Sequence, residues 1–182
     1  MSFLSRRRFS AAALGLAAGS AWPAWAAATD LLADQGPAPE FTGLGQWFNS
    51  DPLTMQGLSG KVVLVDFWTY TCINCLNTLP HVLGWHARYK DQGLVVVGVH
   101  TPEFAFEKLS GNVASAVQRL GIHYPVAQDN AYATWKAYDN QYWPAFYLVD
   151  RSGRVRREHF GEGAYDEMDR AIQALLAQPP RG

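Results

Sequence analysis

The sequence is poor in cysteine, in methionine and in net charge. Its 182 residues contain two cysteines and three methionines, and the formal net charge is −1. Two cysteines exclude a four-cysteine zinc site and a scaffold held by several disulfides. A charge so close to zero argues against a nucleic-acid partner or an anionic membrane surface. Beyond the N-terminal segment, no apolar run is long enough for a membrane-spanning helix.

The remaining composition is that of a globular protein. Hydrophobic residues make up 48% of the chain and aromatic residues 13%, with seven tryptophans. At this length the chain can bury one hydrophobic core but is too short to be expected to form two domains. We therefore expect a single folded domain.

The N-terminal 28 residues have the pattern of an export signal. Three arginines at 6–8 precede Phe9, and a modestly apolar run extends from Ala11 to about Trp25. The small residues around Ala26 offer a cleavage site, and the arginines resemble a twin-arginine motif. The alternatives are a Sec signal and an uncleaved anchor. We expect export to the periplasm, where the mature protein is soluble and disulfides persist.

The two cysteines form a CxxC motif, Cys72-Ile73-Asn74-Cys75, directly after an apolar strand pattern. At the start of a helix, free N–H groups and the helix dipole favour a thiolate. Cys72 is therefore the predicted nucleophile, and Cys75, one turn further along, is the predicted resolving cysteine. A purely structural disulfide is the alternative, but a bridge that closes so short a loop removes little chain entropy.

Strand and helix patterns alternate after an extended lead-in at residues 29–60. This order predicts an α/β fold, with a central mixed sheet flanked by helices and a final hairpin at 145–160. The predicted strands are 61–68, 93–100, 124–127 and 145–149, and the predicted helices are 72–90, 103–120, 130–138 and 164–177.

Four sequence blocks carry a resemblance to a known family. WTYTCINC (68–75), VVGVHTPEFAFEK (96–108), NQYWPAFYLVD (140–150) and FGEGAY (160–165) stand in order along the chain. They resemble TlpA-like exported thiol-disulfide oxidoreductases of the thioredoxin fold, and most of all the thioredoxin-like domain of DipZ-type proteins. The resemblance implies a thioredoxin-like domain over 61–178, with a helix–strand insertion at 103–127.

The same resemblance implies the partners. It indicates protein disulfide substrates, no cofactor, and a monomer. DipZ-type proteins join this domain to a CcdA-like membrane electron carrier, so we expect a separate CcdA- or DipZ-like donor here.

Three further site residues are assigned with the help of this resemblance. Pro144 stands where the family has a cis-proline that faces the substrate, and Trp68 is the tryptophan before the motif. Asp66 interrupts the apolar strand six residues before Cys72, at the spacing of a buried thioredoxin carboxylate. Burial would raise the pKa of Asp66 and let it accept a proton from Cys75. A structural aspartate is the alternative.

Other residues near the motif are weaker candidates. Glu103 could be a second buried carboxylate, or simply an acidic residue at a helix N-terminus. Tyr70, Trp143 and Tyr142 could form an apolar rim for a partner protein, although core packing explains them nearly as well.

The leading hypothesis is an exported thiol:disulfide oxidoreductase that acts as a reductase. One alternative is a peroxiredoxin-like peroxidase, because Thr69 stands three residues before Cys72, but Val65 replaces the proline that such a motif needs. The other alternative is a copper-handling protein that uses the two cysteines and a histidine. Its methionines, at 1, 55 and 168, form no cluster.

Overall fold

The computed structural model describes residues 32–179. The predicted export signal, residues 1–28, lies outside this range. Within the described range, no helix is both long and apolar enough to cross a membrane.

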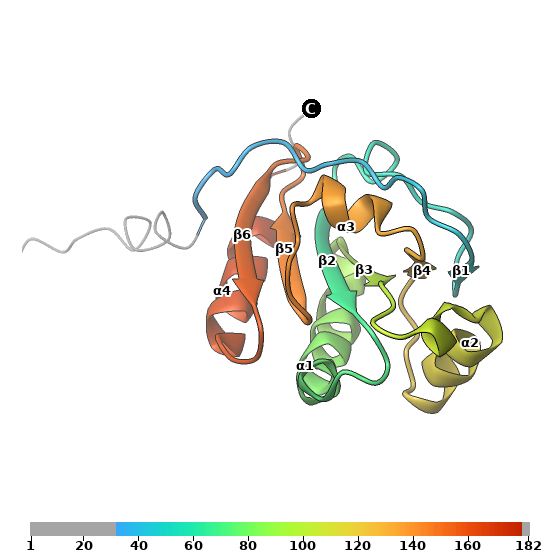
Figure 1. The fold of residues 1–182 in the computed structure, drawn as a ribbon. Helices are drawn as coiled ribbons and strands as arrows, with labels where there is room; N and C mark the ends of the chain where they lie inside the picture. Colours follow the sequence, from blue (N-terminus) through green and yellow to red (C-terminus); the bar gives the residue numbers. More distant parts are fainter. Residues whose placement is uncertain (1–31, 180–182) are drawn as a thin grey trace, which may run out of the picture.

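One mixed sheet of six strands forms the centre of the molecule (Figure 1), in the order β1-β4-β3-β2-β5-β6. The strands β2, β3 and β4 run parallel, whereas β5 pairs antiparallel with both β2 and β6, and β1 pairs antiparallel with β4. This is the predicted thioredoxin-like α/β architecture. The strands are β1 (Trp47–Phe48), β2 (Val62–Trp68), β3 (Leu94–His100), β4 (Val126–Gln128), β5 (Ala145–Val149) and β6 (Val155–Phe160).

Helices and the lead-in cover the two faces of this sheet (Figure 1). With the sheet they make two apolar cores. One core lies between the sheet and α1, α2 and α4, and it contains Cys75. The other lies under α3 and the lead-in segment. The helices are α1 (Ile73–Tyr89), α2 (Ser110–Arg119), α3 (Ala133–Ala137) and α4 (Tyr165–Leu176), with two 3₁₀ helices at Lys90–Gln92 and Ala105–Lys108.

The predicted helix at 103–120 is in fact two elements. The 3₁₀ helix Ala105–Lys108 comes first, Leu109 is extended with φ −75° and ψ 116°, and α2 begins at Ser110. The Glu107 side chain accepts hydrogen bonds from the N–H groups of Glu103 and Phe104, which closes the first element as a separate turn. Together with β4, these elements form the predicted helix–strand segment after the second buried strand.

The predicted helix at 130–138 is also shorter than expected. It begins at Ala133, because the Asp129 carboxylate accepts hydrogen bonds from the N–H groups of Ala133 and Trp135, at 2.8 and 2.7 Å. A carboxylate in this position satisfies N–H groups that have no partner within the helix.

Strand β2 is buried along its whole length, and its alternation directs side chains to both cores. Val63, Val65 and Phe67 point toward α3, whereas Leu64 and Trp68 point toward α1. By this period of two, Asp66 points to the same face as Trp68 and α1. Its partner across the sheet is Gly98 of β3.

We predict that Gly98→Ala destabilises the fold. A Cβ at Gly98 would lie 3.0 Å from Trp68 Nε1, 3.1 Å from a Tyr124 ring carbon and 3.2 Å from a Val126 methyl carbon. Overpacking of this kind typically costs about 1–3 kcal/mol. The change should appear as a lower free energy of unfolding in urea.

Gly84→Ala is the matched control for this substitution. Gly84 lies inside α1 and no atom lies within 4 Å of the Cβ that it would gain. Alanine is favoured over glycine in a helix by about 0.5–1 kcal/mol. An equal change in the free energy of unfolding for Gly98→Ala and Gly84→Ala would contradict the close packing at Gly98.

Candidate active site

The two cysteines lie where β2 passes into α1. Strand β2 ends at Trp68, three loop residues follow, and Cys72 is the residue that caps the N-terminus of α1. Cys72 and Cys75 form a disulfide with Cα atoms 5.2 Å apart. The Cys75 N–H donates to Cys72 Sγ at 3.1 Å. The structure therefore places Cys72 Sγ against the N–H groups that begin a 17-residue helix.

The two sulfur-bearing residues differ in accessibility. Cys72 is half-buried, whereas Cys75 is 4% exposed and belongs to the core under α1. A large partner can reach only the more accessible sulfur. An N–H donor and the helix dipole at Cys72 also favour a thiolate over a thiol at that residue.

The Trp143–Pro144 peptide bond is cis. Pro144 is buried just before β5, and β5 begins at Ala145, which pairs with Phe67 of β2. The proline therefore lies at the end of the sheet from which the Cys72 loop departs. Its carbonyl accepts a hydrogen bond from the N–H of Gly161 at 2.8 Å, which ties the loop after β6 to the proline.

The three aromatic residues proposed as a rim have different environments. Trp143 is half-buried, with its indole N–H donating to the Thr101 carbonyl at 3.1 Å and its ring 4.2 Å from that of Trp135. Tyr70 stacks on His100 with ring centroids 5.5 Å apart. Tyr142 is 55% exposed. Trp143 is therefore mainly a packing residue, whereas Tyr142 is open to solvent.

Asp66 is a buried carboxyl group on the α1 face of the sheet. It is 3% exposed, and Oδ1 has no hydrogen-bond partner among residues 32–179. Burial raises the pKa of Asp66 to about 8. The fully buried Tyr124 lies close to it, and burial together with the Asp66 carboxylate raises the pKa of Tyr124. Asp66 can therefore exchange a proton near neutral pH.

The second buried carboxylate near the motif is Glu107, and Glu103 is exposed. Glu107 Oε1 accepts from the Thr71 hydroxyl at 2.5 Å, and Oε2 accepts from the N–H groups of Glu103 and Phe104 at 2.6 and 3.0 Å. Although burial alone would raise it, hydrogen bonds from Thr69, Thr71 and these N–H groups lower the pKa of Glu107. The carboxylate thus ties the inserted segment to the loop that carries Cys72.

Sequence reasoning missed Glu107 because it treated 103–120 as one helix, in which Glu103 occupies the first turn. The available signal was the acidic residue between Phe106 and Lys108, four residues further along. Glu107 lies instead in the short 3₁₀ helix that ends before Leu109, and its side chain is fully buried.

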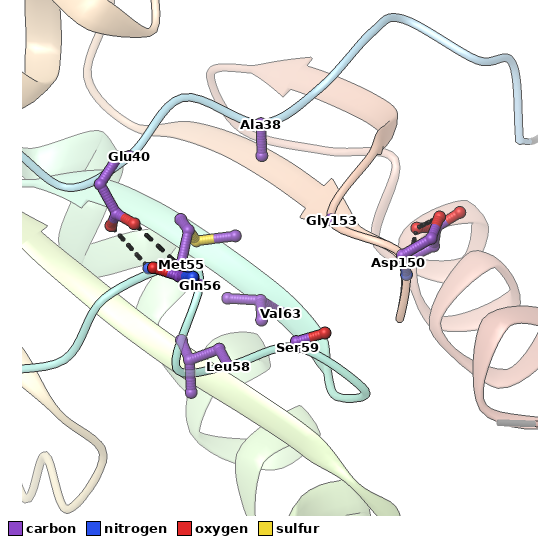
Figure 2. Close-up of a pocket in the computed structure, with 10 residues that line it drawn as sticks. Ala38, Glu40, Met55, Gln56, Leu58, Ser59, Val63, Asp150 and Gly153 are labelled. Carbon is purple, nitrogen blue, oxygen red and sulfur yellow. Dashed lines mark hydrogen bonds between the residues drawn. The ribbon is translucent and has the colours of Figure 1, made fainter. Parts of the chain in front are cut away.

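A pocket of about 250 Å³ lies at the opposite end of the sheet, between the lead-in and the turn after β5 (Figure 2). Glu40 accepts from the N–H groups of Met55 and Gln56 at 2.6 and 3.2 Å, as Figure 2 shows. Asp150, at the other end of the pocket, accepts from the Ser152 N–H at 2.8 Å and pairs with Arg156. Both carboxylates therefore hold chain segments together and take no part in the thiol site.

The sheet order, the CxxC disulfide at the start of α1 and the cis-proline opposite β2 define a thioredoxin-fold protein with a dithiol–disulfide site. A structural neighbour, a thioredoxin-like superfamily protein, matches with a TM-score of 0.75 and 27% identity over 80% of this chain and 99% of its own. The chain belongs to the AhpC/TSA family, whose model matches residues 35–158.

The chain is also similar in sequence to DipZ and YkuV. DipZ of Mycobacterium tuberculosis is 54% identical over 144 residues, which are 78% of this chain and 21% of DipZ. The chain thus spans about a fifth of the length of that relative. The thiol-disulfide oxidoreductase YkuV of Bacillus subtilis is 30% identical over 142 residues, which are 78% of this chain and 95% of YkuV.

We predict that the stability gained by Asp66→Asn grows with pH. Because the folded-state pKa of Asp66 is raised from 3.8 to about 8, the folded protein keeps a proton that the unfolded chain releases between these values. Wild-type stability should therefore fall relative to Asp66→Asn by up to about 1.4 kcal/mol per pH unit in this window. Above about pH 8 the difference should level off.

Chemical denaturation over a pH series measures this difference. Asp51→Asn, at an exposed aspartate of the lead-in, is the matched control and should run parallel to wild type. A constant offset between Asp66→Asn and wild type would show that Asp66 is ionised in the folded protein throughout the window.

We predict that Glu107→Leu and Glu107→Gln differ sharply. Leucine leaves two N–H groups and a hydroxyl without their acceptor, at a cost of about 1–3 kcal/mol. Glutamine can still accept from the two N–H groups and donate to Thr71. Because the pKa of Glu107 is lowered, its ionised form stabilises the fold above the unfolded-state pKa, and this contribution is lost as pH falls through the folded-state pKa.

Urea unfolding at neutral and acid pH tests both statements. Glu107→Leu should be the less stable variant at neutral pH, and Glu107→Gln should lose less stability than wild type on acidification. Equal stability of the two variants at neutral pH would contradict the assigned hydrogen bonds.

Proposed function

We propose that this protein is a thiol:disulfide oxidoreductase that reduces disulfides in partner proteins. The observation that carries the proposal is the asymmetry of the cysteines, with Cys72 accessible at the start of α1 and Cys75 buried beneath it. YkuV, a thiol-disulfide oxidoreductase of which the match covers 95% of the length, supports the same activity.

In the proposed reaction, the Cys72 thiolate attacks one sulfur of a partner disulfide and displaces the other as a thiolate, which forms a mixed disulfide. The Cys75 thiol then transfers its proton to Asp66 and attacks Cys72 Sγ. The second partner sulfur leaves as a thiolate and takes up a proton. The partner disulfide gains two electrons, and the Cys72–Cys75 dithiol becomes the disulfide. A separate reductant must restore the dithiol.

The surface near Cys72 supports a protein as the partner. Ile73, inside the motif, is 66% exposed, and the inserted segment presents Phe104, Phe106 and Leu109 at 48%, 50% and 59% exposure. Tyr70 links this segment to the motif loop, since its hydroxyl donates to the Phe106 carbonyl at 3.4 Å. Exposed apolar side chains of this kind are typical of protein contact surfaces.

The compartment and the electron donor belong to the same proposal. The arginine-rich segment at 1–28 supports export to the periplasm by the twin-arginine route, with cleavage near Ala26. The similarity to DipZ supports a CcdA- or DipZ-like membrane protein as the electron donor. We further propose that the mature protein acts as a monomer with its domain at 61–178.

The peroxidase alternative depended on Thr69. In the structure its side chain is fully buried, and Thr69 Oγ1 lies 3.2 Å from His100 Nε2. The hydroxyl therefore lies among buried protein groups, with His100 and Glu107 beside it. This favours disulfide exchange over peroxide reduction.

We predict that Cys75→Ser traps partner proteins as mixed disulfides, whereas Cys72→Ser does not. Without Cys75, the bond between Cys72 and the partner has no internal thiol to resolve it. Adducts that dithiothreitol releases should appear on non-reducing gels after incubation with a disulfide-bonded protein. Equal trapping through Cys75 in Cys72→Ser would reverse the two roles.

The reduction potential of the wild-type Cys72–Cys75 pair decides the direction of electron flow between this protein and its partners. A value near that of thioredoxin, about −270 mV, supports a reductase, and a value near about −120 mV supports an oxidase.

A further inference from the structure

A hollow beside the cis-proline loop is not used by the thiol chemistry. Its volume is about 280 Å³, and it lies between the segment after α3 and strands β5 and β6. Five of its lining residues carry the argument, namely Asp139, Tyr142, Tyr147, Glu158 and Phe160. We refer to these five residues as the Tyr142 pocket.

Three aromatic rings form one side of the Tyr142 pocket. Phe160 lies 5.5 Å from Tyr142 and 6.0 Å from Tyr147, measured between ring centroids. The side chains of Tyr142 and Phe160 remain 55% and 43% exposed. Cations bind to the faces of such rings, and the interaction strengthens when several rings surround the ion.

Two carboxylates complete the pocket. Glu158 is paired with Tyr147 across β5 and β6 and therefore lies on the same face as the rings. Neither Glu158 nor Asp139 takes part in any of the ion pairs between described residues. Burial and the neighbouring Asp139 raise the pKa of Glu158, so the two acids lie close enough to repel each other. A cation between them would relieve this repulsion.

The Tyr142 pocket is continuous with the cis-proline loop. Tyr142 stands two residues before Pro144, and Gly161, directly after Phe160, donates its N–H to the Pro144 carbonyl at 2.8 Å. A polypeptide whose disulfide is at Cys72 and whose backbone passes Pro144 can extend a side chain toward these rings.

We propose that the Tyr142 pocket binds a lysine or arginine side chain of the disulfide-bearing polypeptide and so selects basic substrates. The inference rests on the proposed oxidoreductase function. Two acids without an ion-pair partner among the described residues and the exposed rings of Tyr142 and Phe160, backed by the buried Tyr147, match one positive charge on an apolar stem, which is the chemistry of these two side chains.

The test compares disulfide-bonded peptides that differ at one position. A single lysine is placed at successive positions on either side of the cysteine, and glutamate or norleucine replaces it in the reference peptides. Wild type should reduce the lysine peptide with a kcat/KM about five- to tenfold higher at the matching position. Asp139→Asn/Glu158→Gln should remove this preference. Asparagine suits position 139, where φ is 49°.

Glu103→Gln is the matched control, because Glu103 is also exposed but lies outside the pocket. It should keep the preference for lysine. Hydroxyethyl disulfide, which carries no charge, should be reduced equally by wild type and by the double variant. A preference that survives in the double variant, or that disappears in Glu103→Gln, would overturn the proposal.

A binding measurement separates this inference from the proposed function. A lysine peptide with serine in place of cysteine is added to the oxidised wild-type protein, and the aromatic NMR signals of Tyr142 and Phe160 are followed. These signals should shift with the lysine peptide and remain in place with the glutamate peptide. Identical shifts with both peptides would refute the pocket, whatever the redox activity proves to be.

Discussion

Strand β2 is hydrogen-bonded to neighbours on both sides and buried on both faces, and the active-site groups take their positions from it. It pairs with β3 along seven residues and with β5 along five. Such a strand cannot shift its register without turning apolar side chains out of both cores. The place where it ends is therefore fixed, and so is the start of α1, where Cys72 lies.

The same constraint aligns the groups around the cysteines. Because β5 pairs with β2, Pro144 comes to the end of β2 that leads to Cys72. Because side chains alternate, Asp66 points into the core that also contains Cys75. Proton transfer from a buried thiol needs an acceptor that is shielded from water and has a pKa near the working pH. The buried Asp66, with a pKa raised to about 8, suits the acceptor role that we propose for it.

The inserted segment is also held in a fixed position beside the motif loop. Its 3₁₀ helix is held to the motif loop by Glu107, whose carboxylate accepts hydrogen bonds from Thr71 and from two N–H groups of its own segment. This contact brings Phe104 and Phe106 to the surface beside the motif. The Tyr142 pocket lies on the other side of the cis-proline loop, so apolar and acidic surfaces flank the disulfide on two sides.

Much of this protein could be predicted from the sequence alone. The runs at 61–68 and 93–100 are mostly apolar, and Asp66 is the one acidic residue inside them, a pattern typical of strands buried on both faces. The CxxC pair after such a strand predicts the site, and Asp66 is conspicuous because a charge in that run is costly to bury. These are local patterns, and local patterns are what a sequence shows directly.

Other features depend on contacts between residues far apart in the chain. The sequence could not distinguish Glu103 from Glu107, because the partner of the Glu107 carboxylate, Thr71, lies 36 residues away in the chain. The Tyr142 pocket likewise exists only because β5 and β6 pair and bring Tyr147, Glu158 and Phe160 to one face. Hydrogen bonding and strand register between distant segments place these side chains, and no local pattern encodes either.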